Sequence, residues 1–281
     1  MKSVFISNLN DFNEAKEKII SEGARKFHVL ADFDRTLTKC FVKGIKIPSI
    51  ISVLRNENYL SEEYSQKAKA LANHYHPIEM DSKIPLKEKK KYMKEWWEKH
   101  FELLIESKLN KKNLERVVDE GNVEFREGAE EFLDLLHEKK IPLIIMSSSG
   151  IGDIIPMYLE KHGKLYDNVH IITNLYKWDK NGNAVGVSKP IIHVFNKDET
   201  SVKDSPKIYS QIKNRTNVLL LGDSLGDLGM VEGFEYENIL KVGFLNEDIE
   251  KDLEEYKRNF DVVITNDSNM KYVNELVKKI N

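Results

Sequence analysis

The stretch FHVLADFDRTLT, residues 27–38, joins a short and mostly apolar run to a polar segment that contains two aspartates. Such a run is typical of a strand buried on both faces of a parallel sheet. Ligands of open α/β sheets collect beyond the carboxyl ends of the strands, so Asp32 and Asp34 stand where chemistry is expected. Their spacing of two places both side chains on one side of an extended segment. Asp and Thr also form ordinary turns and helix caps after strands, so this motif alone does not decide between function and structure.

Further apolar runs, each ending in polar or glycine-rich turns, extend this pattern along the chain. They occupy residues 141–146, 218–221, 239–242 and 262–264. Amphipathic stretches lie between them, as at residues 128–140, where Phe132, Leu133, Leu135 and Leu136 fall on one helical face. Alternating strands and helices predict an α/β protein with a doubly wound, Rossmann-like parallel sheet.

Residues 45–122 interrupt the alternation, because they are rich in Lys and Glu, helical in period and without a convincing buried strand. We therefore predict a catalytic core formed by residues 1–44 and 123–281, with a helical cap inserted at 45–122. The basic run at 87–91 is either an anion patch or a solvated helix face, and nearby glutamates favour the second interpretation. Asn181-Gly182, between two potential strands, predicts a hairpin.

Composition and charge exclude several classes of protein. Hydrophobic residues make up 41% and charged residues 32% of the 281 residues, which is typical of a globular chain. With 43 basic and 46 acidic residues the net charge is −3, so no global field favours nucleic acid or an anionic membrane. Cys40 is the only cysteine, which excludes an internal disulfide and favours a reducing compartment. We expect a cytoplasmic monomer without a signal peptide or membrane span.

The second polar cluster is Ser147-Ser148-Ser149-Gly150-Ile151-Gly152-Asp153, which again follows a predicted strand. A hydroxyl and several backbone N–H groups at such a junction can bind an anion. The alternative interpretation is a simple serine cap on the next helix.

The third cluster, Gly222-Asp223-Ser224-Leu225-Gly226-Asp227, follows the predicted strand at 218–221. If the two strands are neighbours, Asp223 and Asp227 converge on Asp32 and Asp34. Four buried carboxylates would repel one another unless a cation neutralised them. Oxygen-only ligands indicate Mg²⁺ rather than zinc.

Lys197, in the segment Ile192-His193-Val194-Phe195-Asn196-Lys197, is a weaker candidate. On spacing alone a surface position is the simpler interpretation of one lysine among many. Lys197 is a candidate site residue only because the other motifs are present in the same chain.

In their order and strand-end positions, the four motifs resemble those of the haloacid-dehalogenase superfamily: Asp32-x-Asp34-x-Thr36, Ser148, Lys197 and Gly222-Asp223-x-x-x-Asp227. The wider sequence is similar to the cytosolic pyrimidine 5'-nucleotidases, across the insertion and nearly the whole chain. Ile78-Glu79 and Tyr92-Met93-Lys94-Glu95-Trp96 resemble the cap of that family. The chain departs from the family at His100, where Ser is frequent, and at Ser149, where Ala is usual.

The resemblance implies a haloacid-dehalogenase core and a Mg²⁺-dependent 5'-nucleotidase that prefers pyrimidines. Asp32 would attack phosphorus and become phosphorylated, and Asp34 would serve as acid and then as base. Asp32, the main-chain carbonyl of Asp34 and Asp223 would hold Mg²⁺.

The remaining roles follow from the same resemblance. Ser148 and Lys197 would bind the phosphoryl group, Ser149 would belong to the substrate-binding residues, and Asp227 would orient Lys197 or the metal ligands. Glu79 and His100 would contact the nucleoside. Without the resemblance, Glu79 is an ordinary solvated helix residue.

Two alternatives remain open at this point. The catalytic motifs do not identify the leaving group, so phosphoserine or a sugar phosphate could be the substrate. A protein that binds phosphate without turnover is a second alternative, and the presence of both Asp32 and Asp34 argues against it. Aromatic residues Tyr92, Trp96, Trp97 and Phe101 would favour a nucleotide if one of them faces the site, although aromatics at helical spacing are more often core residues.

Overall fold

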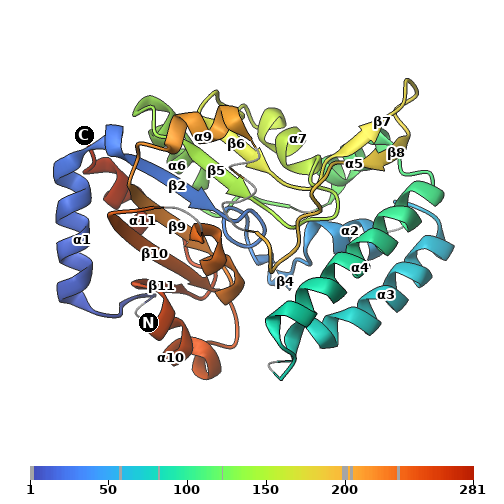
Figure 1. Ribbon diagram of the computed structural model, residues 1–281, viewed down its shortest axis with the longest axis horizontal. Coiled ribbons are helices and arrows are strands. Elements are labelled where there is room, and N and C mark those ends of the chain that lie inside the picture. Colours follow the sequence, from blue (N-terminus) through green and yellow to red (C-terminus); the bar gives the residue numbers. More distant parts are fainter. Residues whose placement is uncertain are drawn as a thin grey trace.

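The computed structural model describes residues 3–56, 59–81, 83–121, 123–197, 202, 205–232 and 235–281. A seven-stranded sheet with the order β1-β11-β10-β9-β2-β5-β6 runs through the larger part of the molecule (Figure 1). Its strands are parallel except β1, which pairs antiparallel with β11. The strands are β1 Val4–Ile6, β2 Phe27–Ala31, β5 Leu143–Met146, β6 Val169–Ile172, β9 Asn217–Gly222, β10 Asn238–Leu245 and β11 Val262–Thr265. The predicted α/β class is confirmed.

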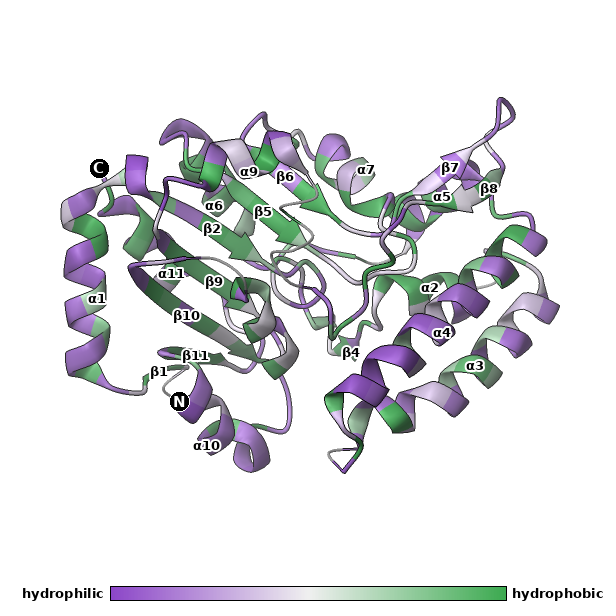
Figure 2. Ribbon diagram, in the orientation of Figure 1, coloured by the Kyte–Doolittle hydropathy of each residue, from purple (hydrophilic) through white to green (hydrophobic). Residues whose placement is uncertain are grey.

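Helices cover both faces of this sheet. They are α1 Leu9–Glu22, α6 Ala129–Glu138, α7 Ile154–Lys161, α9 Pro206–Ile212, α10 Ile249–Asn259 and α11 Lys271–Lys278, with short 3-10 helices η1 Ala24–Lys26 and η2 Leu225–Val231. Alternate residues of β2 enter different clusters, because Val29 and Ala31 pack with α1, α6, α7 and α11 while Leu30 packs with α9 and α10. Apolar residues accordingly fill the central strands, and polar residues line the outer faces of the helices (Figure 2).

The strand order places three polar loops at one edge. β2 lies between β5 and β9, and Ala31 is in register with both Ile145 and Leu221. The backbone N–H of Asp32 donates to the carbonyl of Leu221 at 3.0 Å. The segments after β2, β5 and β9 therefore begin side by side at the carboxyl edge of the sheet.

Residues 45–122, here called the cap segment, are mainly helical and lie beside that edge (Figure 1). They contain α2 Ile50–Asn56, α3 Glu62–Met80, α4 Leu86–Glu106 and α5 Lys111–Glu120, together with β4 Ile45–Lys46, which pairs with β3 Phe41–Val42. The Ser61 hydroxyl caps α3 by accepting from the N–H of Tyr64 at 3.2 Å, and α4 starts after Pro85. Lys87 and Lys91 are exposed, whereas Lys89 and Lys90 are half-buried, so the solvated interpretation of the basic run holds only at its two ends.

The predicted hairpin at Asn181-Gly182 is confirmed, with strands β7 Tyr176–Trp178 and β8 Ala184–Val187. It belongs in sequence to the core, yet it contacts the cap segment. Lys111 donates its backbone N–H to Gly182 O at 2.9 Å, and Phe101 of α4 meets Tyr176 edge to face at 6.0 Å. The hairpin thus links the sheet to α4 and α5.

Among the helices of the described ranges, none combines the length and apolar character that crossing a bilayer requires.

Candidate active site

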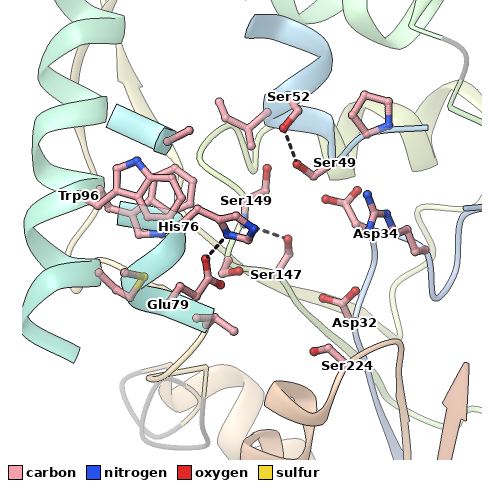
Figure 3. Close-up of a pocket in the computed structure, with 18 of the residues that line it drawn as sticks. Asp32, Asp34, Ser49, Ser52, His76, Glu79, Trp96, Ser147, Ser149 and Ser224 are labelled. Atoms are coloured by element: carbon pink, nitrogen blue, oxygen red, sulfur yellow. Dashed lines mark hydrogen bonds and ion pairs between the residues drawn. The ribbon is translucent and has the colours of Figure 1, made fainter. Parts of the chain in front are cut away.

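A cavity of about 630 Å³ lies between the carboxyl edge of the sheet and the cap segment. Every site residue predicted from the sequence lines it: Asp32, Asp34, Glu79, His100, Ser148, Ser149, Lys197, Asp223 and Asp227. Segments more than a hundred residues apart thus meet in one space. Figure 3 shows Asp32 and Asp34 on one side of the cavity and Glu79 and Trp96 on the other.

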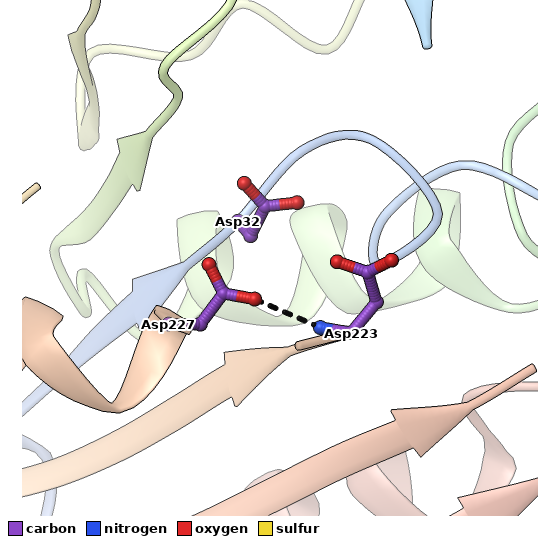
Figure 4. A group of neighbouring side chains, drawn as sticks. All are labelled: Asp32, Asp223 and Asp227. Atoms are coloured by element: carbon purple, nitrogen blue, oxygen red, sulfur yellow. Dashed lines mark hydrogen bonds between the residues drawn. The ribbon is translucent and has the colours of Figure 1, made fainter. Parts of the chain in front are cut away.

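Three of the acidic residues form a close group. One carboxylate oxygen each from Asp32, Asp223 and Asp227 lies within 4.8 Å of the others (Figure 4). Asp32 and Asp227 are buried as whole residues, whereas Asp34 and Asp223 keep some exposed surface, although their carboxyl groups lie in buried surroundings. A lysine among them offsets part of their repulsion.

That lysine is Lys197, only 4% exposed, so the surface interpretation is wrong. Its ammonium group donates to Asp32 Oδ1 and, at 2.8 Å, to Asp227 Oδ1. Burial acts to lower its pKa, but the charges of Asp227 and Asp32 outweigh burial and raise the pKa of Lys197. The lysine is therefore charged and fixed between two carboxylates.

Asp227 organises the loop after β9. Its Oδ2 accepts from the N–H of Asp223 at 3.1 Å, the N–H of Ser224 at 3.0 Å and the Ser224 hydroxyl at 2.9 Å. A Cβ added at Gly222 would come within 2.4 Å of Asp227 Cβ, so glycine is needed for this close approach. Both Asp227 oxygens are thus engaged in hydrogen bonds, which fits a positioning role better than metal ligation.

Burial governs the acidity of the aspartates. It raises the pKa of Asp34 to about 6, against the opposing effects of a hydrogen bond from the Ile50 N–H and the charge of Arg35. Burial also raises the pKa values of Asp32 and Asp223, and Lys197 opposes this rise at both. Asp34 can therefore hold a proton near neutral pH, as a general acid must.

The loop after β5 is not a serine cap. The hydroxyl of Ser147 accepts from the N–H of Ser149 at 3.1 Å, and that of Ser149 accepts from the N–H of Ile151 at 3.3 Å. These bonds shape the loop and leave the Ser148 side chain at the cavity wall. Asp153, at the end of the loop, accepts from the N–H of Tyr176 at 2.9 Å and from the Trp178 indole at 3.0 Å, which ties the loop to the hairpin.

The carboxylate group can accommodate a divalent cation. Asp32 and Asp223 offer carboxylate oxygens at neighbouring strand ends, and burial without a partner would be costly for these charges. Oxygen ligands of this kind suit Mg²⁺. The chemistry of these donors fits a magnesium ion.

The cap wall combines an acid with stacked aromatic rings. The Oε2 of Glu79 lies 3.2 Å from His76 Nδ1, and Lys89 donates to the main-chain carbonyl of Glu79 at 2.7 Å. Trp96 stacks on Tyr75 and on Trp97, each with ring centroids 5.8 Å apart. Trp96 and Trp97 both line the cavity, whereas Phe101 is buried and Tyr92 is not among the lining residues.

Several residues that line the cavity were not predicted from the sequence as site residues, namely Arg35, Ser49, Ser52, Arg55 and His76. A signal was available for three of them, because Ser49, Ser52 and Arg55 are spaced by three residues. That spacing places polar side chains on one side of a helix.

The chain is similar to known proteins along most of its length. Residues 35–281 match the model of the family described as pyrimidine 5'-nucleotidase (UMPH-1). The chain is 38% identical over 259 residues to the Homo sapiens 7-methylguanosine phosphate-specific 5'-nucleotidase, covering 92% of this chain and 86% of that protein. It is similar to the crystal structure of cytosolic 5'-nucleotidase IIIB bound to cytidine, with a TM-score of 0.87, 26% identity, and coverage of 100% and 94%. A substrate-bound phosphoserine phosphatase shares the fold, with a TM-score of 0.54, 18% identity, and coverage of 91% and 98%.

Proposed function

The chain belongs to the pyrimidine 5'-nucleotidase (UMPH-1) family and is a phosphoric monoester hydrolase of the 5'-nucleotidase type, and from this premise we propose that it hydrolyses nucleoside 5'-monophosphates through a phosphoaspartate on Asp32, with Mg²⁺ as cofactor. The observation that carries the proposal is the single cavity that joins Asp32 and Asp34 to Glu79 and Trp96. Asp32 and Asp34 form its reactive end, and Glu79 and Trp96 form what we call its nucleoside end.

In the first step an Asp32 carboxylate oxygen forms a bond to phosphorus while the bond from phosphorus to the 5'-oxygen breaks. Asp34 donates its proton to that oxygen, and the nucleoside leaves as a neutral alcohol. In the second step Asp34 takes a proton from water, the water oxygen bonds to phosphorus, and the bond to Asp32 breaks. Inorganic phosphate is released and both aspartates return to their starting states.

Lys197 and Ser148 assist by contact with the phosphoryl oxygens. Lys197 carries a positive charge at the place where negative charge collects during transfer, and such prearranged charges stabilise a transition state. Asp227 holds the lysine in position. The Ser148 hydroxyl, at the cavity wall, can donate one further hydrogen bond.

Mg²⁺ would be held by Asp32, the main-chain carbonyl of Asp34 and Asp223, and its chemical contribution is to offset negative charge on the phosphoryl oxygens. The acidic group at the strand ends supports this assignment.

The cap end supports a base with an exocyclic amine. Glu79 can accept from the amino group of cytosine, or from the ring N–H and amino group of 7-methylguanine. Both bases can also carry a positive charge, which favours a carboxylate and nearby aromatic rings. CMP and 7-methylguanosine 5'-monophosphate are therefore our preferred substrates. A cavity of about 630 Å³ is in the range that suits a drug-sized ligand and exceeds the needs of phosphoserine.

A substrate panel tests the proposal. CMP, 7-methylguanosine 5'-monophosphate, UMP, phosphoserine and p-nitrophenyl phosphate are compared by phosphate release with Mg²⁺, using wild-type protein and Asp32→Asn. We expect both preferred nucleotides to exceed phosphoserine in kcat/KM and Asp32→Asn to be inactive on all of them. Faster turnover of phosphoserine would replace the nucleotidase assignment, and an active Asp32→Asn would exclude the phosphoaspartate.

A further inference from the structure

A row of polar side chains extends from the catalytic aspartates into the cap segment. Ser49, Ser52 and Arg55 all line the cavity. The Ser49 and Ser52 hydroxyls are 3.0 Å apart, and Arg55 donates from Nη2 to Ser52 Oγ at 2.8 Å. Figure 3 shows Ser49 on the side of the cavity where Asp34 lies. The row therefore starts near the reacting centre and ends at a guanidinium group.

Arg55 is incompletely satisfied. Its Nε is buried without a hydrogen-bond partner, and no carboxylate of the described residues forms an ion pair with it. Leaving a buried donor of a charged group unpaired costs free energy. A ligand that brings acceptor oxygens to this wall would remove that cost.

His100 adds a second unsatisfied group in the same cavity. Its Nε2 is 3.0 Å from the Tyr64 hydroxyl, while its Nδ1 is buried without a partner. Burial, followed by the charge of Arg55, lowers the pKa of His100 to about 3. The ring is thus neutral and adds no competing positive charge beside Arg55.

The place of the row indicates which part of the substrate it meets. Asp34 is assigned to the 5'-oxygen, and the group bonded to that oxygen is the ribose. Glu79 and Trp96 occupy the opposite side (Figure 3). The two adjacent ribose hydroxyls offer neighbouring acceptor oxygens, which match the fixed fork of guanidinium donors.

We propose that Arg55, held by Ser52 and Ser49, binds the 2'- and 3'-hydroxyls of the ribose and selects ribonucleotides over deoxyribonucleotides and compact monoesters. This inference rests on the proposed function of the same cavity. It assigns a role in substrate recognition to Arg55, which the sequence motifs did not include.

The test compares CMP with its 2'-deoxy and 2',3'-dideoxy forms. Wild-type protein should prefer CMP, and Arg55→Met should lower kcat/KM for CMP by roughly tenfold to a hundredfold, mainly through KM. The dideoxy form should lose about twofold or less, so the preference for the ribonucleotide disappears. Ser52→Ala, which removes the anchor of Arg55, should shift the same ratio less far. Arg116→Met is the matched control, because Arg116 lies on α5 and pairs with Glu120 at 3.3 Å.

The possible results distinguish the proposed role of Arg55 from the proposed function of the cavity. Equal losses for CMP and the dideoxy form in Arg55→Met would make Arg55 a structural residue and overturn the inference. The inference would also be overturned if the wild-type protein bound cytidine 3',5'-bisphosphate more tightly than CMP and Arg55→Met did not. The site would then recognise a second phosphate. If circular dichroism shows that Arg55→Met does not fold, Ser52→Ala decides the question. The quantity compared is then the ratio of kcat/KM for CMP to kcat/KM for the dideoxy form. A wild-type protein that hydrolyses no nucleotide faster than phosphoserine would instead refute the proposed function.

Discussion

Trp97 of the cap segment lies directly against Gly150 in the loop after β5. A Cβ added at Gly150 would come within 2.4 Å of indole Cζ3, closer than two such atoms can approach. The aromatic wall of the proposed nucleoside end thus rests on the backbone of the loop that carries Ser148. This contact fixes how near the cap segment and the sheet edge can come.

Gly150→Ala should push the two walls apart. The added methyl group forces Trp97 or the loop to move, and overpacking of this kind costs about 1–3 kcal/mol. We expect a lower melting temperature and a raised KM for CMP, measured by thermal unfolding and steady-state kinetics. Gly186→Ala is the control, since its Cβ would have no neighbour nearer than 3.7 Å. Unchanged KM and melting temperature in Gly150→Ala would contradict the contact.

Asp34→Asn should separate the two chemical steps. p-Nitrophenol leaves without protonation, so this variant should still form the phosphoaspartate from p-nitrophenyl phosphate but hydrolyse it slowly. Losing a proton-transfer partner costs about 10²–10⁴ in rate. Rapid mixing with p-nitrophenyl phosphate should show a burst of one equivalent of p-nitrophenol. Rapid mixing with CMP should show no burst of cytidine, because the 5'-oxygen of cytidine needs a proton to leave. A burst with both substrates would remove Asp34 from the role of acid.

Metal binding should be visible without turnover. Mg²⁺ that binds the folded state alone raises the melting temperature by mass action, and EDTA should reverse the rise and abolish activity. Asp223→Asn should lose the rise, whereas Asp119→Asn, an exposed carboxylate paired with Lys161, should keep it. Ca²⁺ should bind but inhibit, because its larger and looser shell misplaces the attack. Full activity of metal-free protein would refute the assignment.

Glu79→Gln should affect substrates according to their base. Removing a charged acceptor from the nucleoside end costs about 1.5–3 kcal/mol, or roughly tenfold to a hundredfold in kcat/KM. CMP should suffer this loss, and p-nitrophenyl phosphate, which has no base, should lose far less. Glu63→Gln on the same helix, where the exposed carboxylate pairs with Lys67, serves as the control. Equal losses on both substrates would assign Glu79 a structural role.

The sequence predicted those parts of the fold that depend on local pattern. Continuous apolar runs located β2, β5, β9, β10 and β11, because burial on both faces requires apolar residues at every position. β1 was missed, since its three residues are only half-buried and it is defined by antiparallel pairing with β11 far along the chain.

Long-range hydrogen bonds likewise limit how much of the site can be predicted from the sequence. Arg126 is fully buried, and it donates to Thr36 O at 2.8 Å, to Ser268 O at 2.7 Å and to Asn246 Oδ1 at 3.0 Å. It thereby supports the segment that follows Asp34. No spacing in the sequence links these four positions, so only the folded chain reveals the role of Arg126. The motif aspartates were found because Asp32 and Asp223 each immediately follow a strand, and Asp34 and Asp227 lie within the next few residues.

The loop from Ser147 to Asp153 contacts three different parts of the molecule. Ser148 lines the cavity, Gly150 supports Trp97, and Asp153 anchors the hairpin that packs on α4. In the proposed function, seven consecutive residues therefore connect the part of the cavity assigned to the base with the part assigned to the phosphate. We therefore expect substitutions in α4 that move Trp97 to alter phosphate binding at Ser148 as well, unless the loop changes with them.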